Sequence, residues 1–379
     1  MKKNNFFILL LSLCLVVFGG ILLLFYSSLS ETEKVGFEEE SGSKTTAGPN
    51  LHQNEVFPPI YVSIFTHNEE PNSGQYPNFV EEESAFWEQR NGVVQFAQML
   101  HEEGVSYNFQ SDWTFLLAAT LYDSGTLSTH GKNVLRYLKE DLGFEIDPHA
   151  HETSYNYADT AYLIEQLGVE PSFVVGGFIA DPPEKSKLEY LSKPIQGRQY
   201  SSYTWQAEIL MGAGTSLHVN EEALWVSGIW KPQNNEQFQV HDDAASLVAV
   251  GSYTSEWNGL YELLELQKQG VLEPGKIYTA SLFAKQKDFV NETYIEEFRQ
   301  RIQDLADETA AGRIEWVGFG EVYSVWLTEY NAEPNQLFYT DVHSDEFASA
   351  ETASDEGSCG DGICQFIEMR KGVCAEDCG

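Results

Sequence analysis

The chain has 379 residues, of which 42% are hydrophobic and 13% aromatic, so it is too long and too apolar to be a disordered tail or a disulfide-only miniprotein. Its 22 Lys and Arg residues against 58 Asp and Glu residues give a net charge of −36. Nucleic acids and anionic lipid surfaces require a basic surface on the protein that binds them, and this charge excludes both as partners.

The first 30 residues have the pattern of a membrane anchor. Residues 6–26 are 21 uncharged, mostly apolar residues that follow Lys2 and Lys3, and this length spans a bilayer and exceeds the apolar region of a cleaved signal peptide. Because basic residues stay on the cytoplasmic side, the pattern predicts a single-pass signal anchor over residues 1–30 with the rest of the chain extracytoplasmic. Cleavage after Ser30 would instead give a secreted protein.

Two polar segments flank the predicted main domain. Residues 31–57 are acidic and rich in Gly, Ser and Thr, a composition that cannot bury enough surface to fold alone and therefore predicts a flexible linker. Residues 341–358 have a similar composition and predict a second acidic linker. The main domain is expected between them, over residues 58–340.

Within the main domain, short β-branched or aromatic runs alternate with stretches of helical periodicity. In chain order, the predicted strands cover residues 62–66, 106–110, 144–147, 172–176, 224–229, 247–250, 277–283 and 314–317. The clearest predicted helices cover residues 86–103, 134–142, 158–167, 260–269 and 294–309.

Several predicted helices stop on a glycine just before the next strand, at Gly104, Gly143, Gly168 and Gly312. Glycine adopts the left-handed conformation that ends a helix without a Cβ clash, so these are repeated helix-to-strand joints. Repeated βα units predict an α/β fold with a parallel sheet, and seven or eight units in this length favour a (β/α) barrel, regular or distorted, over an open doubly wound sheet. No glycine-rich phosphate motif follows the first strand, which argues against nucleotide binding.

Metal-ligand residue types follow the first three predicted strands. His67 and Glu69 follow the first strand, Asp112 the second, and His149 and His151 the third. Reactive groups of a (β/α) barrel lie at the C-terminal ends of strands, and alternate residues of an extended chain face the same side. Imidazole and carboxylate groups suit zinc, with iron, cobalt, nickel and manganese as alternatives, so the pattern predicts a divalent metal site.

Each of these residues also has a structural interpretation. Asp112 suits the N-cap of a helix that begins at Trp113. Glu69 and Glu70 suit a solvated loop, and the three histidines suit satisfied positions at the rim of a barrel. The main domain contains no cysteine and no G-x-S-x-G motif, so thiol and serine-elbow mechanisms lack their residues.

The segments THNEE at 66–70, NFQSDW at 108–113 and FEIDPHAHE at 144–152 resemble the metal-dependent polysaccharide deacetylase superfamily and, more loosely, related barrel glycosidases. The resemblance implies a metal held by His67, Asp112, His149 and His151, with Glu69 as general base. It also implies hydrolysis of acetyl groups on an envelope or extracellular polysaccharide. In that reaction the metal activates water and polarises the carbonyl, a carboxylate takes the proton of the water and an acid protonates the leaving group.

Further residues are candidates for the remaining roles. Asp242, within a short His-Asp-Asp run before the strand at 247–250, is a candidate acid, and Glu321, after the last predicted strand, is a candidate carboxylate at the mouth of the barrel. Trp205, Trp230 and Trp257 fall in predicted loops beyond strands, where aromatic faces can stack on sugar rings. The structural alternatives are solvated acids and ordinary aromatic packing.

Two other functions stay open on the sequence. A glycosidase needs two opposed carboxylates, for which Asp112 with Asp242 or Glu321 is the candidate pair. A catalytically inactive glycan-binding or surface-display protein is the other alternative. It is suggested by His67-Asn68-Glu69 where deacetylases carry adjacent aspartates, and by a histidine pair separated by one residue instead of three.

The last 21 residues, 359–379, form a separate cysteine-rich segment with Cys359, Cys364, Cys374 and Cys378. An even count in a short exported segment predicts two disulfides, in any of three pairings, over a four-thiolate zinc site. The segment resembles a small module of exported microbial proteins. Its acids suit either a calcium site or a plain surface: Asp361, Glu368, Glu376 and Asp377.

Overall fold

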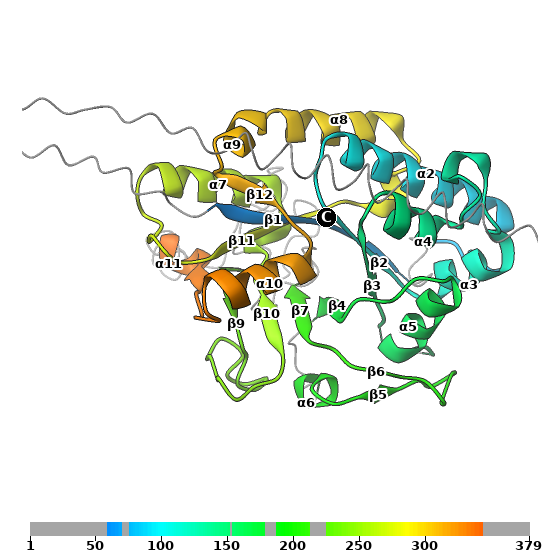
Figure 1. Cartoon of the computed structure of the whole chain (residues 1–379), viewed down its shortest axis with the longest axis horizontal. Coiled ribbons are helices and arrows are strands. Elements are labelled where there is room, and N and C mark those ends of the chain that lie inside the picture. The colour runs from blue at the N-terminus through cyan, green and yellow to red at the C-terminus, as the bar shows by residue number, and fades with distance from the viewer. Residues whose placement is uncertain (1–58, 70–75, 152–153, 179–186, 213–224, 344–379) are drawn as a thin grey trace, which may run out of the picture. The chain divides into compact units, whose positions relative to one another are not determined.

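The computed structural model describes residues 59–69, 76–151, 154–178, 187–212 and 225–343 (Figure 1). The predicted anchor over 1–30, the linker over 31–57, the cysteine-rich segment over 359–379 and nearly all of the linker over 341–358 lie outside these ranges and stay predictions. In the described ranges no helix combines the length and apolar character needed to cross a membrane.

A first sheet contains the strands that carry the predicted metal ligands. Its strands run in the order β11 (Tyr278–Phe283), β1 (Ile60–Asn68), β2 (Tyr107–Ser111) and β3 (Glu145–Pro148), and each neighbouring pair is parallel. On the side away from β11, β12 (Ile314–Trp316) pairs with residues 60–62 of β1, and β2 pairs with residues 64–68. The two strands therefore follow each other along one edge of β1.

A second sheet contains three parallel strands, β4 (Val174–Phe178), β7 (Ile209–Gly212) and β10 (Val248–Val250), with β9 (Ile229–Trp230) antiparallel at its edge. An isolated parallel bridge between His149 and Gly176 connects the end of β3 to β4. On the other side, the backbone N–H of Ser281 in β11 donates to the carbonyl of Ser252, just after β10. The predicted parallel βα repeat is confirmed.

One predicted strand does not form the parallel strand that the sequence pattern indicated. The run at 224–229 forms two short strands, β8 (Val226–Ser227) and β9, whose pairings are antiparallel. The parallel position between β4 and β10 belongs to β7, which sequence patterning missed because a buried run of four residues carries no polar alternation to mark it as a strand.

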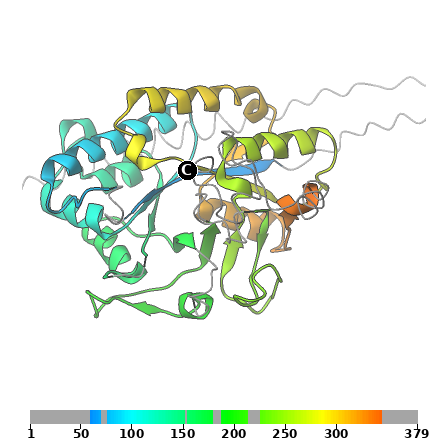
Figure 2. The ribbon, with the colours of Figure 1, turned by 180° about the vertical axis from the view of Figure 1, so that it is seen from behind.

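Helices cover the first sheet, as the two opposite views show (Figures 1 and 2). The longer helices are α2 (Glu83–Glu102), α3 (Trp113–Tyr122), α5 (Tyr157–Gln166), α7 (Trp257–Lys268), α8 (Glu292–Gln303) and α10 (Phe319–Glu329). The shorter elements are α4 (Val134–Arg136), α6 (Lys187–Leu191), α9 (Ala306–Ala310), α11 (Tyr339–Val342), η1 (Leu127–Thr129), η2 (Tyr137–Asp141), η4 (Tyr253–Ser255), η5 (Gln286–Asp288), β5 (Ile195–Gln196), β6 (Thr204–Trp205) and β13 (Leu337–Phe338).

The glycines predicted to end helices do adopt left-handed conformations, with φ of +70°, +80°, +82° and +69° at Gly104, Gly143, Gly168 and Gly312. Their lack of a Cβ lets the chain reverse into the following strand without a clash with the preceding carbonyl. The sequence therefore correctly located these joints.

Alternation along β1 separates two apolar cores. Ile60, Val62 and Ile64 face the core shared with α2, α3 and α8, whereas Tyr61 and Phe65 face a second core. That second core also contains inward residues of the other sheet and of α10: Val174, Ile209, Met211, Val248, Phe319 and Trp326. The inner layer therefore lies between the two sheets, and His67, two residues after Phe65, lies at the end of it.

Candidate metal centre

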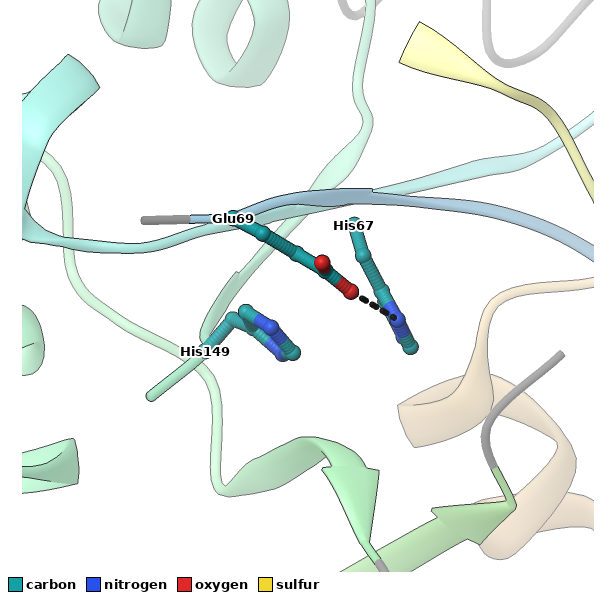
Figure 3. A group of neighbouring side chains, drawn as sticks. All are labelled: His67, Glu69 and His149. Atoms are coloured by element: carbon teal, nitrogen blue, oxygen red, sulfur yellow. Dashed lines mark ion pairs between the residues drawn. The ribbon is translucent and has the colours of Figure 1, made fainter. Parts of the chain in front are cut away.

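The ends of β1 and β3 bring together two predicted ligands, His67 and His149, and the predicted general base, Glu69. His67 is the inward residue at the end of β1, Glu69 follows it with the same alternation, and His149 follows β3. His67 and His149 are buried, while 17% of the Glu69 side chain is exposed. Each of the three offers a ligand atom, and these atoms lie within 4.8 Å of one another. Figure 3 shows their side chains turned toward a common point.

The distances define the group more closely. Nδ1 of His67 lies 3.9 Å from Oε1 of Glu69, and Nε2 of His151 lies 4.0 Å from the same oxygen. The Nε2 atoms of His149 and His151 are 3.2 Å apart, as their alternate spacing predicts. The rings of His67 and His149 stack with centroids 4.5 Å apart.

His149 is held in one orientation by its second ring nitrogen. Its Nδ1–H donates to the carbonyl of Gly176 at 2.9 Å, which leaves the lone pair of Nε2 directed at His151. The hydroxyl of Tyr157 donates to the same carbonyl at 3.3 Å. A metal-binding imidazole typically donates its other N–H in this way, which sets its tautomer and direction.

Gly177 leaves the space that the two stacked imidazoles occupy. A Cβ at this residue would lie 2.8 Å from Cε1 of His149 and 3.0 Å from Cε1 of His67, and the backbone φ is +69°. Sequence reasoning missed this residue, which directly follows the predicted strand at 172–176, although glycines at the end of a strand signal a close backbone approach. The Gly176-Gly177 pair thus supplies a hydrogen-bond acceptor and an open surface for the histidines.

The donor set fits a transition-metal ion such as zinc. Zn–N bonds of about 2.0–2.1 Å at tetrahedral angles place ligand nitrogens about 3.4 Å apart, close to the 3.2 Å between His149 and His151. Neutral imidazoles with a carboxylate are also borderline ligands that suit zinc better than calcium or magnesium. His67, Glu69 and His149 therefore form a group that matches a divalent transition metal, and His151 lies next to His149 and Glu69.

Asp112 has a structural role beside this group. Its Oδ1 accepts from the backbone N–H and the hydroxyl of Thr114 at 3.0 Å each, so it caps α3. Its backbone N–H donates to the carbonyl of Asn68, between His67 and Glu69 in β1. The alternative interpretation of Asp112 as an N-cap is thus observed, and its role as a ligand stays a prediction.

The structure does not bring Asp242 or Glu321 to the histidines. β9 runs antiparallel to β10, so the connection over 231–247 that carries Asp242 lies at the N-terminal end of β10. Asp242 caps a local turn through the backbone N–H of Ala244. Glu321 lies in the first turn of α10 and lines a pocket of about 320 Å³ at the N-terminal end of β3. The predicted position of Glu321 at the mouth and the predicted role of Asp242 as the acid beside the metal are both corrected, because the direction of the connecting strand and helix depends on tertiary packing.

That pocket is lined by Glu145, a partly buried acid of β3, and Asp147, two residues further along the strand, is fully buried. Asp147 accepts from the side chains of Asn108 and Gln110, at 2.9 and 3.0 Å, and from Ser172 at 2.5 Å. Glu145 accepts from the backbone N–H of Gly320 in α10. Burial raises the pKa of both carboxyls, and the nearby Asp147 raises the pKa of Glu145 further. Burial thus favours the protonated forms of this pair.

The predicted sugar-stacking tryptophans take part in packing. Trp230 is fully buried and donates its indole N–H to the carbonyl of Phe238. Trp205 is buried, donates to the carbonyl of Ser172 and stacks on Tyr157 at 6.1 Å. Trp257 packs edge-on against a ring of α8 at 5.0 Å. Their observed contacts agree with the packing alternative.

No family model and no curated protein matches this chain. Solved structures that resemble it include a 4-alpha-glucanotransferase from Thermococcus litoralis, with 13% identity, a TM-score of 0.41 and coverage of 73% of this chain and 39% of that chain. A protein of Parabacteroides distasonis described as a glycoside hydrolase/deacetylase has 11% identity, a TM-score of 0.45 and 72% coverage of both chains. A protein of Mycobacterium smegmatis described as a polysaccharide deacetylase has 11% identity, a TM-score of 0.41 and coverage of 74% and 93%.

This chain spans about two fifths of the length of the glucanotransferase. The chemistry of this chain has to be inferred from its own residues.

Proposed function

We propose that this protein is a metal-dependent hydrolase that removes N- or O-acetyl groups from an envelope or extracellular polysaccharide. The convergence of His67, Glu69, His149 and His151 at the ends of β1 and β3 supports it most strongly. Imidazoles around one point with a carboxylate beside them are a donor set with which zinc sites activate water. The main domain contains no cysteine and therefore no thiol nucleophile, so acyl hydrolysis here would use water activated by the metal.

The residues of the site take separate roles in this proposal. His67, His149 and His151 would hold the ion, which supplies a Lewis acid for the acetyl carbonyl and a water of lowered pKa. The carbonyl of Gly176 keeps the Nε2 atom of His149 directed into the site. Glu69 accepts the proton of the attacking water, because its Oε1 lies about 4 Å from two of the imidazoles and its side chain is partly exposed.

We also propose that the two sheets form a distorted (β/α) barrel around the inner core. The bridge between His149 and Gly176 on one side supports this arrangement. The hydrogen bond from Ser281 to Ser252 supports it on the other side. In such a barrel the metal centre lies at the C-terminal ends of the strands, the usual place for catalysis.

Metal content of the full chain tests the site. The purified protein is expected to retain about one equivalent of zinc or another transition metal after dialysis against a weak chelator, and the double variant His149→Ala/His151→Ala is expected to lose it while its circular dichroism is unchanged. His130→Ala is the matched control, because this histidine is largely exposed and pairs with Asp141. Equal metal content in the double variant and the native chain would contradict the assignment.

The variant Glu69→Gln tests whether Glu69 acts as the general base or as a metal ligand. Loss of a general base is expected to lower kcat/KM for acetate release from acetylated oligosaccharides by about 10²–10⁴ at unchanged metal content. Loss of the metal in this variant would make Glu69 a ligand and refute its role as base. A native chain that binds metal but releases no acetate from N- or O-acetylated glycans would refute deacetylation and favour the glycan-binding alternative.

The glycosidase alternative lacks support in the described part of the chain. It requires a second carboxylate opposed to Asp112. Asp242 and Glu321, the two candidates, lie toward the N-terminal ends of the strands, whereas Asp112 follows the C-terminal end of β2.

A further inference from the structure

Five aromatic rings form a continuous row that runs from the start of α3, past the segment before α5, to α5 and the β5–β6 hairpin. Trp113 stacks on Tyr155 with centroids 4.6 Å apart and planes 8° apart. Tyr155 then lies 6.5 Å from Tyr200, Tyr200 lies 4.1 Å from Tyr162, and Tyr162 lies 5.4 Å from Tyr203. One side of each ring packs on an apolar core, and every ring remains partly exposed.

One end of the row is close in sequence to the proposed metal ligands. Trp113 directly follows Asp112, which is hydrogen-bonded to the backbone between His67 and Glu69. Tyr155 is four residues after His151, so the chain between them spans at most about 14 Å. The other rings lie on α5 and on the β5–β6 hairpin, which Figure 1 shows alongside α5. The row therefore leads away from the place where the reaction is proposed to occur.

The hairpin that carries the outer rings is held firmly. The buried carboxylate of Asp159, in the first turn of α5, accepts the backbone N–H groups of Arg198, Gln199 and Tyr200 at 2.9–3.0 Å. A Cβ at Gly197 would lie 2.6 Å from Oδ1 of the same carboxylate, so the backbone approaches it closely. Charge-assisted bonds of this kind fix the loop before any ligand arrives, which lowers the entropy cost of binding.

We propose that this row is a platform for a polysaccharide chain and that it guides successive sugar units along the metal centre. A pyranose ring has an apolar C–H face that an aromatic ring can cover, and its hydroxyls can bond to tyrosine hydroxyls. The five rings are contiguous and partly exposed, and contiguous exposed apolar surface is typical of binding sites. The net charge of −36 opposes an anionic polymer, so the occupant is a neutral or amino-sugar chain. The proposal rests on the proposed function only for the reaction that follows binding.

Leucine substitutions test the platform while keeping apolar volume against the core. We expect the double variant Tyr155→Leu/Tyr200→Leu of the full chain to bind neutral and amino-sugar polymers at least about tenfold more weakly than the native chain, as measured by calorimetry with partially acetylated chitosan and with the polymers retained on a glycan array. Tyr155→Phe/Tyr200→Phe should restore most of the affinity. Tyr261→Leu is the matched control, because this tyrosine of α7 is 39% exposed and contacts only Trp257 among the rings of the described residues.

Each outcome decides between the two proposals. Unchanged affinity in the folded leucine double variant overturns the platform, as does a native chain that binds none of the neutral or amino-sugar polymers. The His149→Ala/His151→Ala variant is expected to keep its polysaccharide affinity while it loses its metal. If that variant binds sugar normally and the native chain has no hydrolytic activity, the proposed reaction fails and the platform stands.

Discussion

Gly177→Ala provides the sharpest test of how the histidines are positioned. The new Cβ would lie 2.8 Å from a His149 carbon and 3.0 Å from a His67 carbon, closer than Cβ contacts normally come. A left-handed conformation costs an alanine about 1–2 kcal/mol, and overpacking at a rigid site adds about 1–3 kcal/mol. The expected loss of unfolding free energy is therefore about 2–5 kcal/mol, together with separation of the two stacked rings.

Gly312→Ala is the control that separates the cost of the steric contact at Gly177 from the cost of the backbone conformation. Its backbone φ is also +69°, but a Cβ there would meet no atom within 4 Å, so only the conformational cost of about 1–2 kcal/mol is expected. Urea unfolding gives both free energies, and competition with a chromophoric chelator gives zinc affinity. Zinc affinity should fall by about 10–100-fold in Gly177→Ala and stay unchanged in Gly312→Ala. Equal losses of stability with equal zinc affinity would refute the assigned contact.

Two further variants test the interior. Burial and Asp147 raise the pKa of Glu145 in the folded chain, so the folded state binds more protons than the unfolded state. The unfolding free energy should therefore fall as pH rises from the ordinary carboxyl pKa of about 4.3 toward the raised pKa of Glu145. Glu145→Gln should flatten this fall between pH 5 and 8 in urea titrations, whereas parallel profiles would contradict the shift. Arg90 and Asp123 form a fully buried ion pair at 3.1 Å, so Asp123→Ala should cost about 3–5 kcal/mol. The exposed Glu189→Ala is the control and should cost far less, because water screens its pair with Lys193. A loss at Asp123 as small as at Glu189 would contradict that assignment.

Local chemistry was readable from the sequence. The period-2 spacing of an extended chain predicted that His149 and His151 can face one point, and their Nε2 atoms are 3.2 Å apart. The same alternation predicted that His67 and Glu69 approach one point, and they lie 3.9 Å apart. Glycines at helix ends were predictable because the conformation they require depends only on the local backbone. These features involve residues close in the chain, so no long-range packing had to be known.

Tertiary structure alone decided which distant residues meet. Asp242 and Glu321 follow or precede strands as the pattern requires, yet the antiparallel β9 and the inward packing of α10 place them away from the histidines. The aromatic row depends on the β5–β6 hairpin, which Asp159 attaches to α5 across about 40 residues of sequence. Hydrogen bonds and packing between separate elements set these positions. Because these contacts join residues that are far apart in sequence, the spacing of residues along the chain does not predict them.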